Sequence, residues 1–84
     1  MSYQVLILRR AQKELSRLPT KDYERVRDGI NGLARDPRRS GSRKLVGREG
    51  WRIRVGDYRV IYEINDTAQQ VTVLQVGHRR DVYT

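Results

Sequence analysis

The sequence predicts a two-layer α+β domain: an N-terminal strand, a helical hairpin, and then three to four antiparallel strands. Its 84 residues suffice for one small domain spanning 1–84. Apolar residues repeat with helical spacing in the first half, and they alternate with a period of two after residue 50. Two helices lying across such a sheet leave its other face partly exposed, and we expect the functional site there.

The first half of the chain carries the expected strand and both helices. Residues 3–8 are β-rich and apolar on both parities, which is typical of a central strand covered on both faces. Apolar residues at helical spacing over 8–18 predict a first helix, and Thr20 is placed to cap a second helix with its stripe over 23–33. Two glycines in that second helix each cost about 1 kcal/mol relative to alanine unless close packing requires them: Gly29 and Gly32.

The second half begins with a glycine-rich, basic connection. Residues 38–50 are predicted to be mobile and to hold at most a short strand around 44–46. Residues 71–76 supply the last β-rich run, and a short basic tail over 77–84 follows it.

Between these segments lies a strong hairpin signal. A two-residue turn at Gly56-Asp57 makes partners step outward symmetrically, so Arg54 faces Arg59. One face then carries the core residues Trp51, Ile53, Val55, Tyr58, Val60, Tyr62 and Ile64. The other face carries Arg52, Arg54, Arg59, Ile61 and Glu63.

The charge balance indicates an anionic partner. The chain has 18 Lys+Arg against 10 Asp+Glu, a net charge of +8, and residues 35–59 alone contribute +6. Nucleic acid is the first partner to consider and an acidic protein the second. Opposed arginines destabilise a hairpin, whereas a phosphodiester would offset that cost because guanidinium groups fork onto phosphate oxygens. The alternative is that these arginines are solvated or pair with Glu63.

Several classes of protein are excluded. The absence of cysteine and the single histidine, His78, rule out a disulfide framework and a zinc site, so we expect no metal. A core of this size encloses no large cofactor, and we expect none. The apolar stretch near the N-terminus precedes its arginines and is too short to span a bilayer, which favours a cytoplasmic protein without membrane contact.

Four segments carry a resemblance to a known family: 43–47 (RKLVG), 51–55 (WRIRV), 56–62 (GDYRVIY) and 76–83 (VGHRRDVY). Together with the order of elements, they resemble the RelE branch of the RelE/ParE toxin superfamily over nearly the whole chain. The resemblance implies the RelE-like microbial RNase fold. It also implies a type II toxin that enters the A site of the 70S ribosome and cleaves mRNA there without a metal.

The same resemblance implies the site and the partners. The 2′-hydroxyl attacks the adjacent phosphate to leave a 2′,3′-cyclic phosphate, and the catalytic positions are Arg52, Arg54, Arg59, Arg79 and Tyr83. The RNA-binding positions are Arg43, Lys44, Arg48, His78 and Arg80. A cognate acidic antitoxin is the expected protein partner, and the resemblance allows a toxin–antitoxin complex that binds operator DNA through the antitoxin.

Two other functions remain as alternatives. The ParE branch shares the fold but inhibits DNA gyrase without catalysis. A simple nucleic-acid-binding module is less favoured, because the hairpin aromatics fall on the core face. Relatives often have lysine where this chain has Arg52 and Arg54, and arginine is a poor general base. The base is therefore Tyr83 or His78, or the arginines act by charge and orientation alone.

Overall fold

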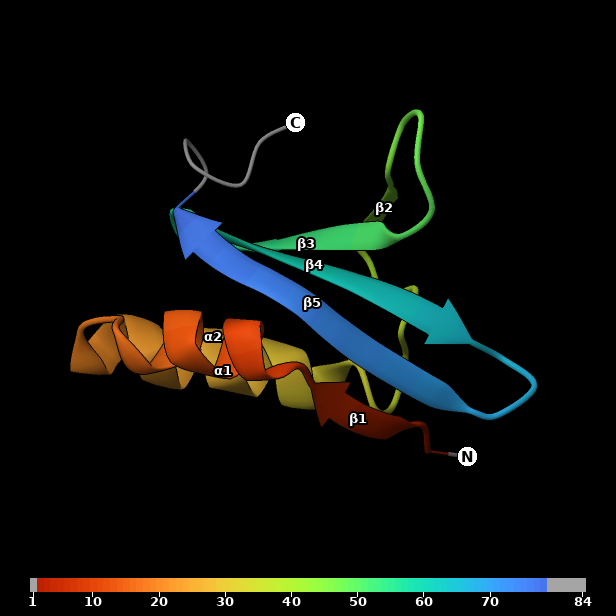
Figure 1. Ribbon diagram of the computed structural model, residues 1–84, viewed down its shortest axis with the longest axis horizontal. Coiled ribbons are helices and arrows are strands. Elements are labelled where there is room, and N and C mark those ends of the chain that lie inside the picture. The colour runs from red at the N-terminus through yellow and green to blue at the C-terminus, as the bar shows by residue number, and fades with distance from the viewer. Residues whose placement is uncertain (1, 79–84) are drawn as a thin grey trace.

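The computed structural model describes residues 2–78 and places two helices against one face of a five-stranded mixed sheet (Figure 1). The elements are β1 (Gln4–Ile7), α1 (Arg9–Ser16), α2 (Thr20–Gly32), β2 (Arg43–Lys44), β3 (Trp51–Val55), β4 (Tyr58–Asn65) and β5 (Gln70–His78). The spatial order of the strands is β1-β5-β4-β3-β2. β1 runs parallel to β5, and the other neighbours are antiparallel. The predicted two-layer α+β fold is confirmed.

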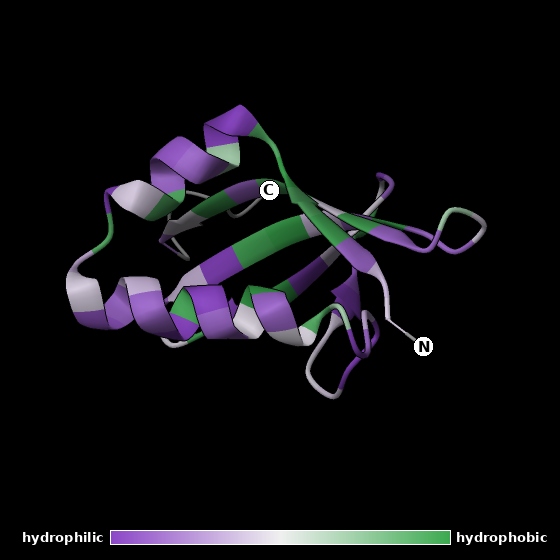
Figure 2. Ribbon diagram, turned by 90° about the horizontal axis from the view of Figure 1, so that it is seen from below, coloured by the Kyte–Doolittle hydropathy of each residue, from purple (hydrophilic) through white to green (hydrophobic). Residues whose placement is uncertain are grey.

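The core lies between the helices and the sheet. Ala11 and Leu15 of α1 and Val26 and Ile30 of α2 are buried, as their helical spacing predicts. The sheet contributes side chains that are at most 1% exposed: Ile53, Val60, Tyr62, Val71, Val73 and Val76. Figure 2 shows the outer surfaces of both helices as mostly hydrophilic and long stretches of the strands as hydrophobic. Within residues 2–78, neither helix has the length and apolar character to cross a membrane.

The prediction that residues 3–8 form a central strand is wrong, because β1 lies at the edge of the sheet. Tyr3, Val5 and Ile7 pack against the core, whereas Leu6 is 39% exposed. The valine-rich β5 takes an interior position between β1 and β4, with both edges paired. An apolar run on both parities does not by itself fix the place of a short strand in a sheet.

The predicted cap of the second helix is also wrong. Pro19 occupies the N-cap without a side-chain hydrogen bond, and Thr20 is the first helical residue. The Pro19 carbonyl accepts the amide of Tyr23 at 2.8 Å, and Asp22 supplies a negative charge in the first turn, where the helix dipole favours one. α2 ends at Gly32, and tightened turns follow it to residue 35.

The hairpin register is confirmed. Val55 pairs with Tyr58 and Arg54 with Arg59. Gly56 has a φ of +58°, a conformation that glycine adopts readily, so the chain reverses within two residues. The short strand predicted around 44–46 lies slightly earlier, at Arg43–Lys44.

The connection between α2 and β2, predicted to be mobile, is anchored by Arg38. Its Nη1 and Nη2 atoms donate to Asp66 at 3.1 and 2.9 Å, and its guanidinium lies 5.4 Å from the centroid of the Trp51 ring. The Tyr3 hydroxyl donates to the same carboxylate at 2.7 Å. Arg38 first, and then Tyr3, hold the pKa of Asp66 at about 2. These contacts join the residue before β1, the α2–β2 connection, the β4–β5 turn and β3.

Replacement of Asp66 by asparagine should lower the melting temperature at neutral pH. The Asp66 pKa is lowered from 3.8 to about 2 by folding, so its contribution is present above pH 3.8 and disappears as the pH falls towards 2. Melting curves of wild type and Asp66→Asn between neutral and acidic pH should therefore converge over that window. An Arg38→Gln, Asp66→Asn double variant should lose little more than either single variant. A constant gap at every pH would contradict the charge-based explanation.

Gly29→Ala should destabilise the protein although alanine is the better helix former. An added Cβ would lie 2.9 Å from Cγ2 of Val55, a contact that neither β3 nor α2 can relieve without moving. We expect a loss of about 1–3 kcal/mol in the free energy of unfolding, measured by urea denaturation. The matched control is Gly32→Ala, whose Cβ meets nothing closer than Arg39 Nη1 at 3.6 Å. That variant should be neutral or more stable, and equal losses in both would contradict the packing argument.

Candidate nucleic-acid interface

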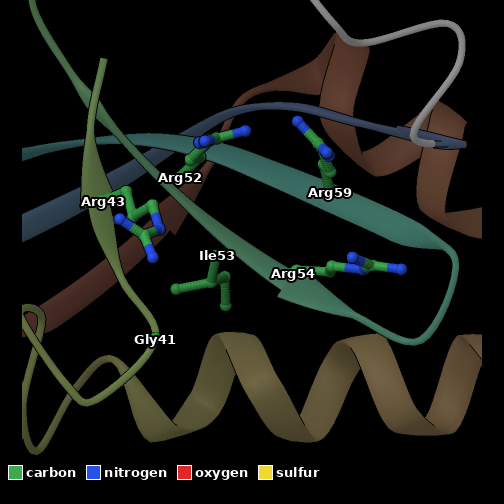
Figure 3. Close-up of a pocket in the computed structure, with 6 residues that line it drawn as sticks. All are labelled: Gly41, Arg43, Arg52, Ile53, Arg54 and Arg59. Carbon is green, nitrogen blue, oxygen red and sulfur yellow. The ribbon is translucent and has the colours of Figure 1, made fainter.

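Four arginines gather on the sheet face that lies away from the helices. Arg43 of β2 is directly opposite Arg52 of β3, and Arg54 of β3 is directly opposite Arg59 of β4. Their neighbours Ile53 and Val60 point into the core, so strand alternation puts all four guanidinium groups on the other face. We call Arg43, Arg52, Arg54 and Arg59 the arginine cluster; Figure 3 shows their side chains.

A pocket of about 340 Å³ lies within this cluster, lined by its four arginines together with Gly41 and Ile53. It forms because β2 pairs with only two residues of β3, Trp51 and Arg52. Beyond Arg52 the outer edge of β3 is open, and the chain bends away at Gly41, which has a φ of +93°. The volume falls within the range of pockets that take small organic ligands.

The arginine cluster brings four positive charges together on one face of the sheet. Within residues 2–78, Arg43, Arg52 and Arg54 make no ion pair, and Glu63 on the same face does not pair with them. Arg54 Nε instead donates to the Gly56 carbonyl at 3.2 Å, which holds this side chain towards the turn (Figure 3). Two directly opposed arginine pairs are unfavourable by themselves, and an anion between them would relieve the repulsion.

Ile61 lies on the same face as the cluster but is only 3% exposed and is separate from the main core. The sequence places it on this face, and its burial is a finding of the structure. It faces Arg52 on one side and Gln75 on the other. The arginines therefore stand beside a buried apolar residue, where low polarity strengthens their attraction for an anion.

Two of the predicted RNA-binding residues lie elsewhere. Lys44 is opposite Trp51 and therefore projects from the other face of β2. His78 is opposite Tyr58, with ring centroids 5.8 Å apart, on the helix-facing side of β5. There the Tyr58 hydroxyl donates to Asp22 Oδ2 at 3.4 Å. Burial raises the pKa of Tyr58, and the negative charge of Asp22 raises it further. The structure does not bring Lys44 or His78 to the cluster.

The remaining predicted residues are less closely defined. Arg48 is exposed in the loop between β2 and β3 and does not line the pocket. Arg79, Arg80 and Tyr83 lie outside the described residues. The sequence reasoning did not find Gly41. A glycine before a short basic strand is the signal that could have indicated where the chain leaves the sheet.

A leading strand, a helical hairpin and a five-stranded mixed sheet make up the RelE-like α+β fold, which is the fold of a class of toxins. The family model described as "ParE toxin of type II toxin-antitoxin system, parDE" matches residues 5–83. The chain therefore belongs to this family of the RelE/ParE superfamily and is a toxin of a type II toxin–antitoxin system.

Individual relatives support this assignment. The chain is 36% identical over 87 residues to Toxin RelG of Mycobacterium tuberculosis, covering 99% of this chain and 98% of the relative. Among solved structures it is similar to the RelBE2 toxin–antitoxin complex of M. tuberculosis, with a TM-score of 0.85 and 30% identity over 94% of this chain and 93% of that one. It is also similar to the archaeal RelE-RelB complex of Pyrococcus horikoshii, with a TM-score of 0.81 and 33% identity over 94% and 97% of the two chains.

Adjacent residues of β2 offer a direct test of the arginine cluster. Arg43→Gln should weaken binding of a single-stranded, 2′-O-methyl RNA, and the salt dependence of its affinity should fall by about 0.7 in logarithmic slope, the value for one phosphate contact. The matched control Lys44→Gln removes the same charge from the next residue on the opposite face and should leave that slope near the wild-type value. Fluorescence anisotropy over a range of salt concentrations measures both. Equal effects would mean that only net charge matters.

Proposed function

We propose that this chain is a ribosome-dependent mRNA endoribonuclease that cleaves the message in the A site. The observation that carries the proposal is the arginine cluster, in which two opposed arginine pairs face solvent without a carboxylate on Arg43, Arg52 or Arg54 within residues 2–78. Such an arrangement is suited to a phosphodiester, because each guanidinium is always charged and can bind two phosphate oxygens.

The proposed reaction needs no group beyond the RNA and the protein. The ribose 2′-oxygen attacks the adjacent phosphorus and loses its proton to a base, and the bond from phosphorus to the 5′-oxygen breaks. That oxygen takes up a proton and leaves as a 5′-hydroxyl, while the other fragment keeps a 2′,3′-cyclic phosphate. Negative charge accumulates on the phosphoryl oxygens in the transition state, where preorganised arginines stabilise it more than in the ground state.

We assign the roles by position. Arg59 and Arg79 clamp the reacting phosphate, Arg52 and Arg54 bind the RNA backbone and stabilise charge, and Tyr83 stacks on a base or transfers a proton. His78 is the weaker candidate for the base, since its ring packs against Tyr58 on the helix-facing side. Arginine itself seldom gives up a proton near neutrality. We therefore propose that orientation by the ribosome supplies much of the rate.

An acidic antitoxin is the proposed protein partner. The similar structures from M. tuberculosis and P. horikoshii are toxin–antitoxin complexes. The net charge of +8 on this chain favours a partner of opposite charge that covers the arginine cluster. Inhibition of DNA gyrase is the second candidate function, because the matching family model is that of ParE toxins.

Purified protein added to an in vitro translation reaction should cut the translated message at discrete sites within ribosome-occupied codons, mapped by primer extension. A message of the same sequence without a ribosome-binding site should remain nearly intact, because the arginine cluster is generic for phosphates and depends on the ribosome for alignment. Arg59→Gln is the inactive control, because it removes one guanidinium from the arginine cluster, and its melting temperature is measured beside that of the wild type.

A parallel supercoiling reaction with purified DNA gyrase separates the alternatives. An intact message together with inhibited gyrase would replace the proposal with the ParE-type function. Equal cleavage of translated and untranslated message would refute ribosome dependence. If the message stays intact and gyrase still supercoils DNA, both functions are refuted.

A further inference from the structure

A second basic pocket lies next to the arginine cluster, between the β3–β4 turn and α2. It has a volume of about 540 Å³, and its lining includes three arginines, a carboxylate and two glycines: Arg25, Arg39, Arg54, Asp28, Gly29 and Gly56. We call it the turn pocket. Arg54 lines both this pocket and the pocket of the arginine cluster, so the two adjoin at that side chain.

The charge of the turn pocket is positive. Three guanidinium groups face one carboxylate, and Asp28 is already engaged with Arg27, whose Nη2 lies 3.3 Å from its Oδ1. Arg25 and Arg39 make no ion pair within residues 2–78. Asp28 alone cannot neutralise three guanidinium groups, so the pocket keeps a positive charge that attracts an anion.

Arg39 gives the pocket an unmet hydrogen-bonding requirement. Its Nε atom is buried and has no hydrogen-bond partner in the described part of the chain. Its guanidinium lies along α2, with Nη2 about 4.0 Å from the position that a Cβ on Gly29 would occupy and Nη1 about 3.6 Å from that position on Gly32. A buried donor without a partner is costly, and an anion at the adjoining guanidinium edge would compensate for that cost by charge.

Arg54 is held where it can serve both pockets. Its Nε donates to the Gly56 carbonyl at 3.2 Å, so the side chain extends along the end of the hairpin rather than across the sheet (Figure 3). Phosphates repeat at every nucleotide of an RNA strand, so one strand can present an anion to each of the two adjoining pockets. Carboxylates of a protein have no comparable regular spacing, which favours RNA over an acidic peptide as the occupant.

We propose that the turn pocket is a second phosphodiester site, in which Arg25 and Arg39 bind an RNA phosphate beyond the one held by the arginine cluster. The inference rests on the proposed nuclease function and extends it. The phosphate belongs either to the message on one side of the cleaved bond or to the RNA of the ribosome. These two sources share the same chemistry and are separated by the experiment.

The variants are Arg25→Gln and Arg39→Gln, with Lys21→Gln as the control that removes one exposed positive charge from α2 away from the pocket. Arg25 is exposed, so its replacement should leave the melting temperature unchanged. Binding is measured to a 2′-O-methyl nonanucleotide RNA, to ribosomes with a vacant A site, and to an oligoglutamate peptide.

If the message supplies the phosphate, both pocket variants should bind the nonanucleotide about three- to tenfold more weakly at low salt, with the logarithmic salt slope reduced by about 0.7. If ribosomal RNA supplies it, nonanucleotide binding stays at the wild-type level and affinity for vacant ribosomes falls instead. Lys21→Gln should change neither. Variants that match Lys21→Gln in both measurements, or that weaken only oligoglutamate binding, would overturn the inference.

The cleavage reaction keeps this result separate from the proposed function. A wild-type protein that cuts translated message, with pocket variants that bind every RNA normally, would refute the turn pocket alone. A wild-type protein that cuts nothing, with pocket variants that bind RNA more weakly, would refute the nuclease and retain the phosphate site.

Discussion

The positive φ of Gly56 fixes the register of the β3–β4 hairpin, and this register determines what each face of the sheet carries. A two-residue reversal places Ile53 opposite Val60 on the core side and Arg54 opposite Arg59 on the free side. A shift of one residue would exchange the two sets and turn charged groups into the core. Packing of the core and assembly of the basic surface are therefore two results of the same turn.

The helices support the sheet that carries this surface. Glu14 of α1 accepts the backbone amide of Val76 in β5 at 2.8 Å, and the close approach of α2 to Val55 is possible only because residue 29 is glycine. Arg38 joins the α2–β2 connection to Asp66 and lies over the Trp51 ring. The backbone that carries the arginines is therefore already in place when an anion binds, and only their side chains have to be ordered.

Local patterns predicted the hairpin well, since a short turn determines its own register and strand alternation then assigns each side chain to a face. They were less informative where the structure depends on distant segments. The parallel pairing of Val5 with Val71 joins the first strand of the chain to the last, and nothing near residue 5 indicates that it lies at the edge of the sheet. The opposite orientations of Arg43 and Lys44 follow from where a two-residue strand begins. The composition of the tail does not predict which residues it pairs with. The partner of His78, which is Tyr58, follows only from the pairing of β5 with β4.

The position of β5 between β1 and β4 has a consequence for the synthesis of the protein. β1 and β4 are both joined to β5, so the first strand reaches the rest of the sheet only through a strand made some 66 residues later, as the pairing of Gln4 with Gln70 shows. Contacts over such a separation form late and slowly. A growing chain can form its helices and the β3–β4 hairpin, but the five-stranded sheet is incomplete until β5 has emerged. Most of this toxin has therefore been synthesised before its complete fold can form.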